Sequence, residues 1–412
     1  MRWSPPVSTS FDREGPHDNS TGRQRHDGAL GAVGERGTVL TAAGVWPLLA
    51  LLAGPAAGPA RKEPAEALGT DADRAVREGC ELLGALDAAD GVDAALGLWT
   101  RRVLALRPEW LTGLPLDLHG ELTGDASADQ NALDAWAQRH TDGLIERMPV
   151  RVTPDMLLVL ASALLVRTTW AEPFRESPLR VTEGPWAGQE LTGLHRYRTA
   201  AEQVRVHHTP AGPLTAFDVP GDNGLAVRLL LGPEDMTGGE VLHHGLAALG
   251  GGYRTVPGAE LPEGAGPGLT VTEMASWGRH TAGGSGHRRF AVAAEHDLLE
   301  RAGLFGLEAV MDNSCGHFPG LSETPLAVST ARQTATATFG PLGFRAAAVT
   351  AVTAGVAGVP PTPPYQARLV SARYDRPFGF LAVHRASGLV LVAGWATDPD
   401  GWDGRPVGPG MW

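Results

Sequence analysis

The stretch from Met156 to Val166 (MLLVLASALLV) constrains the fold most, because it is almost wholly apolar and carries no charge. A run this continuous is typical of a strand that is buried on both faces of a sheet. Periodicity alone does not distinguish such a strand from a buried helix. The run is too short to cross a membrane, which takes about 18 uninterrupted apolar residues. We therefore predict a sheet that is covered on both faces.

Two segments predict helices that pack against such a sheet. Thr38–Leu40 followed by Val45–Ala53 indicates a short strand that leads into a buried helix. Ser127 and Gln130 form the pattern of a capping box, in which the serine side chain accepts a backbone hydrogen bond and the glutamine reaches back. We expect this helix to begin at Ser127.

The remaining signals mix strands and helices. Pro220–Gly224 marks a predicted hairpin turn, and a second hairpin joins Phe378–His384 to Leu389–Trp395. Phe290–Ala294 predicts a strand, and His296–Leu307 a helix after it. Because strands and helices do not alternate strictly, the fold class is α+β.

Charge and cysteine content exclude several classes of protein. Lys and Arg total 34 against 46 Asp and Glu, a net charge of −12, which argues against a nucleic-acid-binding surface. The two cysteines, Cys80 and Cys315, form neither a disulfide framework nor a four-ligand zinc site. They are idle thiols or one long-range disulfide. Residues 1–12 carry no secretory pattern, so we expect a cytoplasmic protein, although an upstream start codon would leave secretion open.

One segment differs from the rest because it contains no acidic residue between Glu323 and Asp375. Pro325–Phe339 predicts a long strand, and Arg345–Val359 consists almost wholly of Ala, Val, Thr and Gly. Pro360–Pro364 is a stiff polyproline stretch. Small and β-branched residues suit a strand that enters a packed sheet. The simpler interpretation is a low-complexity linker before the last hairpin.

Searches for catalytic motifs find nothing convincing. The Gly283–His287 segment (GGSGH) comes closest to a nucleophile elbow, but it lacks the final glycine and is predicted to lie in a loop. A hydrolase using Ser285 and His287 is therefore a minor hypothesis. No metal motif or cofactor motif occurs. We expect a protein that is not an enzyme and has no cofactor, no metal and no membrane partner.

A family resemblance organises these observations. From about Gly37 to Pro399 the chain resembles the serpins, on five motifs that occur in the family's order. They are the helix signature Trp136, Thr141, Gly143 and Ile145; the buried strand Leu160–Leu164 with Trp170 and Pro173-Phe174; the turn Phe318–Ser322; the strand Pro325–Phe339; and the hairpin Arg376-Pro377-Phe378 with Gly388–Gly394.

The resemblance implies a serpin fold, with three β-sheets, about nine helices and an exposed reactive loop over about 343–368. In that family a serine protease cleaves the loop, and the N-terminal half of the loop then inserts into the main sheet. Inserted side chains alternate between core and solvent, and the native state is kinetically trapped. The hinge and its first inserted residues would be Gly343, Phe344, Arg345, Ala346, Ala347, Ala348 and Thr350.

The hinge and the residues beneath the sheet depart from the family pattern. Pro341 stands where the family usually has Glu, and it would remove a ladder hydrogen bond from a central strand. Phe344 would enter the first inward slot, where overpacking costs about 1–3 kcal/mol. The positions that match the family's shutter cluster beneath the sheet also carry different residues. They are Thr41, Gly44, Ser162 and Gln333.

The scissile bond is placed by two counts that disagree. Counting forward from Gly343 places it near Val356, Ala357 and Gly358, which would suit elastase- or subtilisin-like proteases. Counting back from Pro377 places it near Gln366, because this loop is about nine residues longer than usual. Arg368 would instead suit a trypsin-like pocket.

We therefore predict a monomeric inhibitor of serine proteases that acts as a suicide substrate. The alternative is a non-inhibitory serpin-fold protein, used for binding or cleaved as a plain substrate, because of Pro341 and Phe344. We divide the chain into a polar, partly helical extension (1–36), a single domain (37–399) and a C-terminal tail (400–412).

Overall fold

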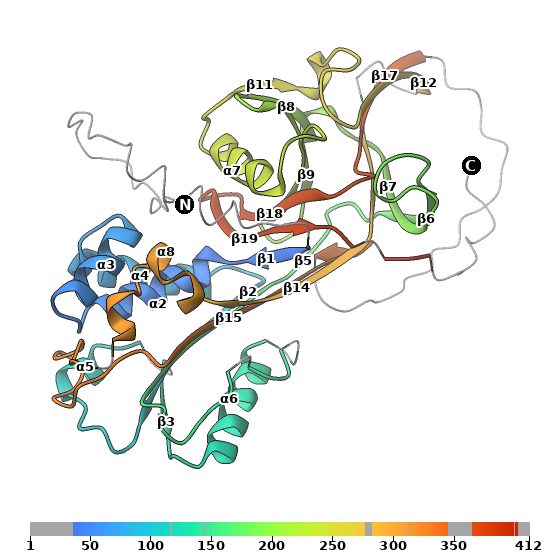
Figure 1. Cartoon of the computed structure of the whole chain (residues 1–412). Coiled ribbons are helices and arrows are strands. Elements are labelled where there is room, and N and C mark those ends of the chain that lie inside the picture. Colours follow the sequence, from blue (N-terminus) through green and yellow to red (C-terminus); the bar gives the residue numbers. More distant parts are fainter. Residues whose placement is uncertain are drawn as a thin grey trace, which may run out of the picture.

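A computed structural model describes residues 36–115, 118–141, 143, 145–148, 150–276, 282–312, 314–344, 365–398 and 400–402. The strands of this part of the chain form three β-sheets, as the resemblance implied. Figure 1 shows a long diagonal sheet with helices above and below it, and the two other sheets toward its upper end.

The long sheet, here called the main sheet, has a central parallel pair. Its long strands, in spatial order, are β3 (His119–Leu122), β2 (Val92–Arg101), β4 (Leu158–Val166), β15 (Thr330–Phe339) and β14 (Phe290–Asp297). β4 and β15 run parallel, with Val159 opposite Thr330 and Ala163 opposite Thr334. The other neighbours of these two strands, β2 and β14, are antiparallel to them.

The apolar run from Met156 to Val166 is a strand that is buried on both faces, which confirms the prediction. Val159 and Ala161 pack with residues of α6 (Ala126–His140). Leu160 and Leu164 belong to the core on the opposite side, which includes α2 (Ala42–Ala53). Successive side chains of β4 point to opposite faces of the sheet, so the strand contributes residues to both cores. Figure 1 shows α6 and α2 on opposite sides of the main sheet.

Helices on the α2 side pack closely. Besides α2 this side carries α3 (Pro59–Leu68) and α4 (Ala72–Asp87). Asp71 caps α4 by accepting a hydrogen bond from Arg74 N at 3.0 Å. A Cβ on Gly79 would lie 3.2 Å from the Ala50 Cβ, so a glycine lets α4 approach α2. The other α-helices of the described residues are α5 (Pro108–Thr112), α7 (Gly238–Leu249) and α8 (Ala302–Phe305), which makes seven against the nine or so expected.

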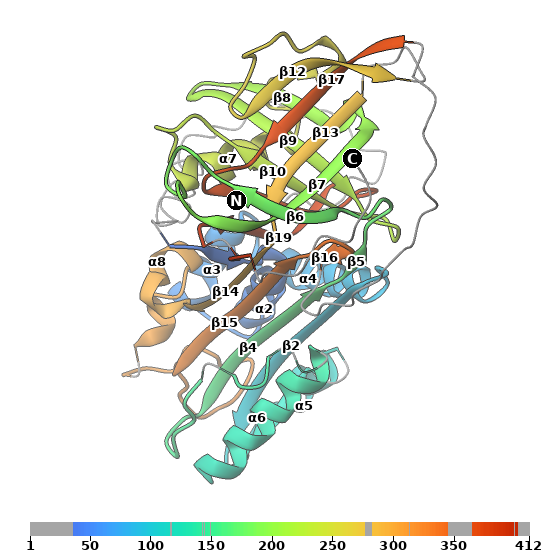
Figure 2. The same cartoon turned by 90° about the vertical axis from the view of Figure 1, so that its right-hand side faces the viewer.

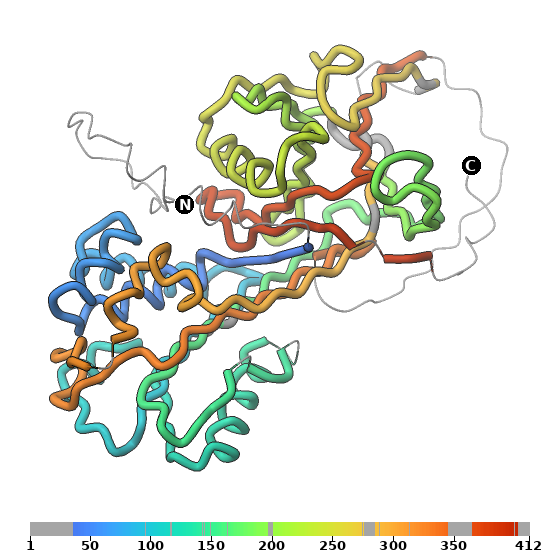
Figure 3. Tube along the Cα trace, in the orientation of Figure 1, coloured from blue at the N-terminus to red at the C-terminus, as the bar shows by residue number. Residues whose placement is uncertain are grey.

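The second sheet contains both predicted hairpins. Its strands, in spatial order, are β1 (Thr38–Leu40), β19 (Leu389–Ala396), β18 (Phe378–His384), β10 (Leu225–Leu231), β9 (Gly212–Pro220), β8 (Val204–Thr209) and β11 (Arg254–Pro257). Helix α7 covers one face of it through a shared apolar cluster. In the tube of Figure 3 the N-terminal strand, in blue, lies beside the C-terminal strands, in red, since β1 pairs with β19.

The third sheet holds the strand that follows the predicted loop. Its strands, in spatial order, are β12 (Leu269–Ser276), β17 (Tyr365–Arg373), β13 (Ala282–Arg288), β7 (Glu190–Ala200) and β6 (Arg175–Arg180). No helix of the described residues is long and apolar enough to cross a membrane.

Several local predictions were wrong. Helix α6 begins at Ala126 and its cap is Asp125, which accepts from Ser127 N at 2.9 Å, so the box starting at Ser127 does not form. His296 lies in β14 opposite Gln333, since pairing with β15 along the whole of β14 extends the strand past Ala294. The helix predicted there shrinks to a 3₁₀ turn and the single turn of α8.

One further expectation also differs from the structure. The GGSGH segment lies wholly within strand β13 (Ala282–Arg288), which pairs with β7 and β17, and not in a loop. At the C-terminus, Asp400 accepts a hydrogen bond from Arg289 Nε at 2.8 Å, and its carbonyl accepts one from Thr192 N at 3.1 Å. Cys80 and Cys315 are both free thiols.

Candidate functional site

At the end of β15 the chain turns back on itself. Gly340 N donates to Gly343 O at 3.0 Å, and Phe339 pairs antiparallel with Phe344. The resulting short strand is β16 (Gly343–Phe344). Gly343 has to be glycine here, since a Cβ would lie 2.3 Å from the Thr168 carbonyl oxygen.

Strand β16 lies between two strands of the main sheet. It pairs antiparallel with β15 on one side and with β5 (Thr168–Thr169), the continuation of β4, on the other. β4 and β15 pair directly only as far as Ala163 and Thr334. At the end of the sheet β16 lies between Phe339 of β15 and Thr168 of β5, and Figure 2 shows β16 beside β5 there.

Carbonyl groups anchor the turn that precedes β16. Pro341 O accepts from Phe174 N at 2.8 Å, and Leu342 O accepts from Trp170 N at 2.9 Å. The indole Nε1 of Trp170 donates to Gly340 O at 2.9 Å. In this state Pro341 lies in a turn, where no ladder hydrogen bond is needed, so its expected effect on an inserted strand stays a prediction.

Phe344 is already in the core, with 2% of its surface exposed. Its ring centroid lies 6.2 Å from that of Phe380. Phe290 packs on both Phe380 and Phe339, at 5.0 Å and 5.4 Å between centroids. An apolar side chain at the first inward slot thus joins an existing aromatic cluster.

Lower in the main sheet, the four predicted shutter positions come together. Thr41 N donates to Gln333 Oε1 at 3.2 Å, and Gln333 Nε2 donates to Thr41 O at 2.9 Å. A Cβ on Gly44 would lie 3.5 Å from Ser162 Oγ and 3.7 Å from Gln333 Nε2. All four residues are buried, and Ser162 Oγ has no hydrogen-bond partner. The cluster links α2 to the two parallel strands β4 and β15.

Comparisons with known proteins agree with this geometry. A family model described as serpin (serine protease inhibitor) matches residues 32–186. The putative serpin-Z6A of Oryza sativa subsp. japonica is 27% identical over 382 residues, which cover 89% of each chain. Thyroxine-binding globulin in complex with thyroxine superposes with a TM-score of 0.67 at 15% identity, over 92% of this chain and 100% of that chain. Native protease nexin-1 with heparin superposes with a TM-score of 0.68 at 16% identity, over 92% of this chain and 97% of that chain.

The chain has the serpin fold. The resemblance to the serpin family is confirmed, and the fold is shared by the serpin from the trematode Schistosoma haematobium, with a TM-score of 0.65 at 13% identity over 91% of this chain and 97% of that chain. In these terms β16 is the start of the loop that follows β15. As functional residues, Gly343, Phe344 and the shutter cluster stay predictions.

The serpin loop itself is described only at its two ends. Arg345, Ala346, Ala347, Ala348, Thr350, Val356, Ala357 and Gly358 lie outside the described residues.

At the far end of the loop the structure corrects one prediction. Gln366 and Arg368 belong to β17, where they pair with Ala275 and Glu273 of β12. The Arg368 guanidinium also donates to the carbonyl oxygens of Ala259 and Leu261. In this state both residues are held in an extended strand of the third sheet, and Gln366 is exposed there.

A buried arginine beneath the hinge was missed by the sequence analysis. Arg196, in β7, is 4% exposed, and its guanidinium carbon lies 4.0 Å from the centroid of the Phe174 ring. Nη2 donates to Glu172 O, whereas Nε and Nη1 have no partner. Burial lowers the pKa of Arg196 to about 10, which leaves it charged at neutral pH. Nothing in the local sequence signals this, since the two residues that contact the guanidinium, Phe174 and Glu172, lie more than twenty positions earlier in the chain.

The minor hydrolase hypothesis loses its geometric basis. Ser285 and His287 lie two residues apart on β13, with 4% and 0% of their surfaces exposed. The imidazole packs between Phe174 and Phe339, at 4.8 Å and 4.7 Å between ring centroids. A substrate could not reach either side chain without opening this core of the serpin fold.

Proposed function

We propose that the protein inhibits serine proteases as a suicide substrate, with the segment after Phe344 as the bait. The observation that carries this proposal is the position of β16 between β5 and β15, antiparallel to both. A loop strand that enters the main sheet would need this position and this direction. β16 therefore corresponds to the first step of the insertion.

The rest of the main sheet supports the same proposal. β4 and β15 are parallel neighbours along Val159–Ala163 and Thr330–Thr334, so a strand between them could pair antiparallel with each. Separating the two strands would break the hydrogen bonds between them. The inserted strand would then pair with the backbone N–H and C=O groups that were set free. Such a native state would be trapped kinetically, and cleavage would release it.

The target class follows from the residues around the forward-counted scissile bond. Val356, Ala357 and Gly358 are small and uncharged, which favours elastase- or subtilisin-like proteases with shallow apolar pockets. A trypsin-like target loses its main support, because Arg368 lies within β17. We further propose that the protein has no catalytic activity of its own.

A second candidate is a non-inhibitory serpin-fold protein. Its support is the burial of Phe344 at 2% exposure, which anchors the hinge by a large aromatic side chain. Thyroxine-binding globulin, one of the structures with this fold, is described in complex with a small ligand. A hinge that is held fixed would suit a binding protein, or one that proteases simply cleave.

Incubation with an elastase, subtilisin and trypsin separates the two candidates. Inhibition predicts a covalent complex that survives SDS and has the summed mass of inhibitor and protease. It also predicts that the cleaved protein melts at a higher temperature than the intact protein. Clean cleavage within residues 345–364, with no complex and no rise in melting temperature, would support the non-inhibitory candidate.

A further inference from the structure

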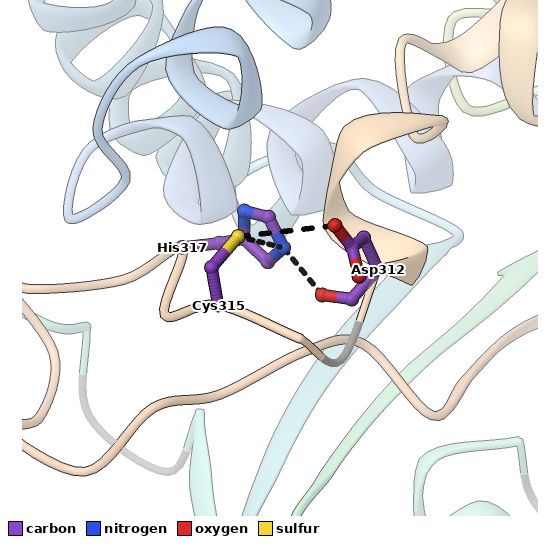
Figure 4. A group of neighbouring side chains, drawn as sticks. All are labelled: Asp312, Cys315 and His317. Atoms are coloured by element: carbon purple, nitrogen blue, oxygen red, sulfur yellow. Dashed lines mark hydrogen bonds between the residues drawn. The ribbon is translucent and has the colours of Figure 1, made fainter.

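A loop that the proposed function does not use brings together three side chains of the types that bind metals. Asp312, Cys315 and His317 lie between the 3₁₀ helix Ala309–Met311 and the segment that leads to β15. Their ligand atoms all lie within 4.8 Å of one another, and no other such group of three occurs among the described residues. Figure 4 shows the three side chains pointing toward one another.

The distances from the sulfur to the other two ligand atoms are close to those of a tetrahedral metal site. Cys315 Sγ lies 3.7 Å from His317 Nε2 and 3.9 Å from Asp312 Oδ2. Zn–S bonds of about 2.3 Å and Zn–N or Zn–O bonds of about 2.0–2.1 Å, at tetrahedral angles, separate sulfur from its neighbours by about 3.5 Å. Shifts of a few tenths of an ångström would bring the sulfur into place.

Hydrogen bonds already hold this loop. His317 is fixed by its backbone, since its carbonyl accepts from Ala57 N at 3.0 Å and its amide donates to Leu326 O at 3.3 Å. Ser314 N donates to Asp312 Oδ1 at 2.8 Å, which leaves Oδ2 for the sulfur side of the cluster.

The histidine is the least exposed of the three ligands, at 7%. Its Nε2 lies 2.5 Å from the Asp312 carbonyl oxygen, so this ring nitrogen faces the main chain of Asp312. The same nitrogen lies 3.7 Å from Cys315 Sγ.

We propose that Asp312, Cys315 and His317 form a three-ligand site for a divalent transition metal of the zinc type. Thiolate and imidazole ligands select such ions over calcium and magnesium. Three protein ligands leave the fourth position to water. Because Asp312 and Cys315 are exposed, the ion would exchange with solvent and would not be a permanent structural part.

Cobalt(II) provides a direct probe of this site in the full-length protein under reducing conditions. We expect a thiolate-to-cobalt charge-transfer band that saturates near one equivalent and disappears when zinc is added. Cys315→Ser should abolish the band, whereas Cys80→Ser should retain it. The band requires a sulfur ligand, so cobalt bound to other histidines of the chain would not produce it.

His317→Ala and His208→Ala provide a second matched pair of variants. His208 is the control, because it is exposed and lies on β8 of the second sheet, outside the proposed site. We expect His317→Ala to weaken zinc binding by at least about tenfold and His208→Ala to leave it unchanged. An unchanged far-UV spectrum would show that each variant is folded. A band that persists in Cys315→Ser, or no band in wild-type protein with a reduced Cys315, would overturn the proposal.

Discussion

Gln333 and Thr41, which lie on β15 and at the start of α2, exchange two hydrogen bonds through one side chain and one backbone. Both residues have 2% of their surface exposed. Water therefore cannot replace either bond when one partner is removed. The pair therefore links the start of α2 to β15, the strand beside which an inserted loop strand would lie.

Gln333→Ala is therefore expected to destabilise the protein. It leaves Thr41 N and Thr41 O buried without partners, at about 1–3 kcal/mol for each group. The midpoint of thermal unfolding should fall by several degrees. Gln189→Ala removes an exposed glutamine and should leave the midpoint unchanged. Equal midpoints for the two variants would show that the pair contributes no stability.

Gly343→Ala should expel β16 from the main sheet. Its Cβ would lie 2.3 Å from the Thr168 carbonyl oxygen, so the backbone has to move. We expect a protease of broad specificity to cut the loop of this variant several-fold faster than the wild-type loop. Gel electrophoresis of samples taken over time measures the rate. Gly340→Ala is the control in the same turn, because its Cβ would meet nothing closer than 3.7 Å. If both variants are cut at the wild-type rate, β16 does not restrain the loop.

Phe344→Ala tests whether the aromatic side chain holds the hinge. Truncating a buried phenylalanine costs about 3–5 kcal/mol when the surroundings do not collapse, so the unfolding midpoint should fall. A released hinge should insert faster, and the yield of SDS-stable complex should rise. Phe344→Leu keeps most of the apolar volume and should lie between wild type and Phe344→Ala. A yield of covalent complex that decreases as the side chain at position 344 is made smaller would contradict this role.

Prediction from sequence succeeded where one short-range pattern decided the outcome. The continuous apolar run of β4 and the turn signals of both hairpins are local. The prediction failed for Arg368 because the end of the loop depends on where β17 pairs with β12, and those strands are far apart in sequence. Counting residues forward from Gly343 or back from Pro377 does not reveal where this pairing begins.

Two other errors arose from competition between adjacent signals. Asp125 and Ser127 are both good caps, and the carboxylate two residues earlier accepts two backbone hydrogen bonds. At His296 the ladder with β15 outweighs the local helical pattern. No metal motif was recognised in the sequence at Asp312, Cys315 and His317, because only the folded loop shows that their ligand atoms converge.

His207 should make stability depend on pH. Its imidazole is 2% exposed, and burial, together with the nearby Arg228 guanidinium, lowers its pKa from 6.5 to about 4. Between these values the unfolded state binds a proton that the folded state does not, so stability falls as the pH falls. The contribution is fully present above pH 6.5 and is lost progressively toward about pH 4.

His207→Gln keeps a hydrogen-bonding group beside Thr255 but removes the titration. Unfolding midpoints measured from pH 7 to pH 4 should fall less steeply in this variant than in the wild type. His208→Gln changes the exposed neighbour and should follow the wild-type curve. Parallel curves for wild type and His207→Gln would show that another group is responsible.

A charge in the loop distinguishes insertion from simple cleavage. Side chains of an inserted strand alternate between core and solvent, and Phe344 is on the inward side. Ala348 would therefore point inward and Ala347 outward. Ala348→Arg would bury an unpaired charge, which costs several kcal/mol, whereas Ala347→Arg would place the same charge in solvent.

We expect Ala347→Arg to form the covalent protease complex in nearly wild-type yield, and Ala348→Arg to be cleaved with little or no complex. Both variants carry the same substituent in adjacent positions, so altered recognition by the protease would affect them alike. Densitometry of the complex and cleaved bands gives the partition directly. Equal partition in the two variants would mean that the loop does not enter the sheet with the alternation that starts at Phe344, because only an inserted strand discriminates between neighbouring positions.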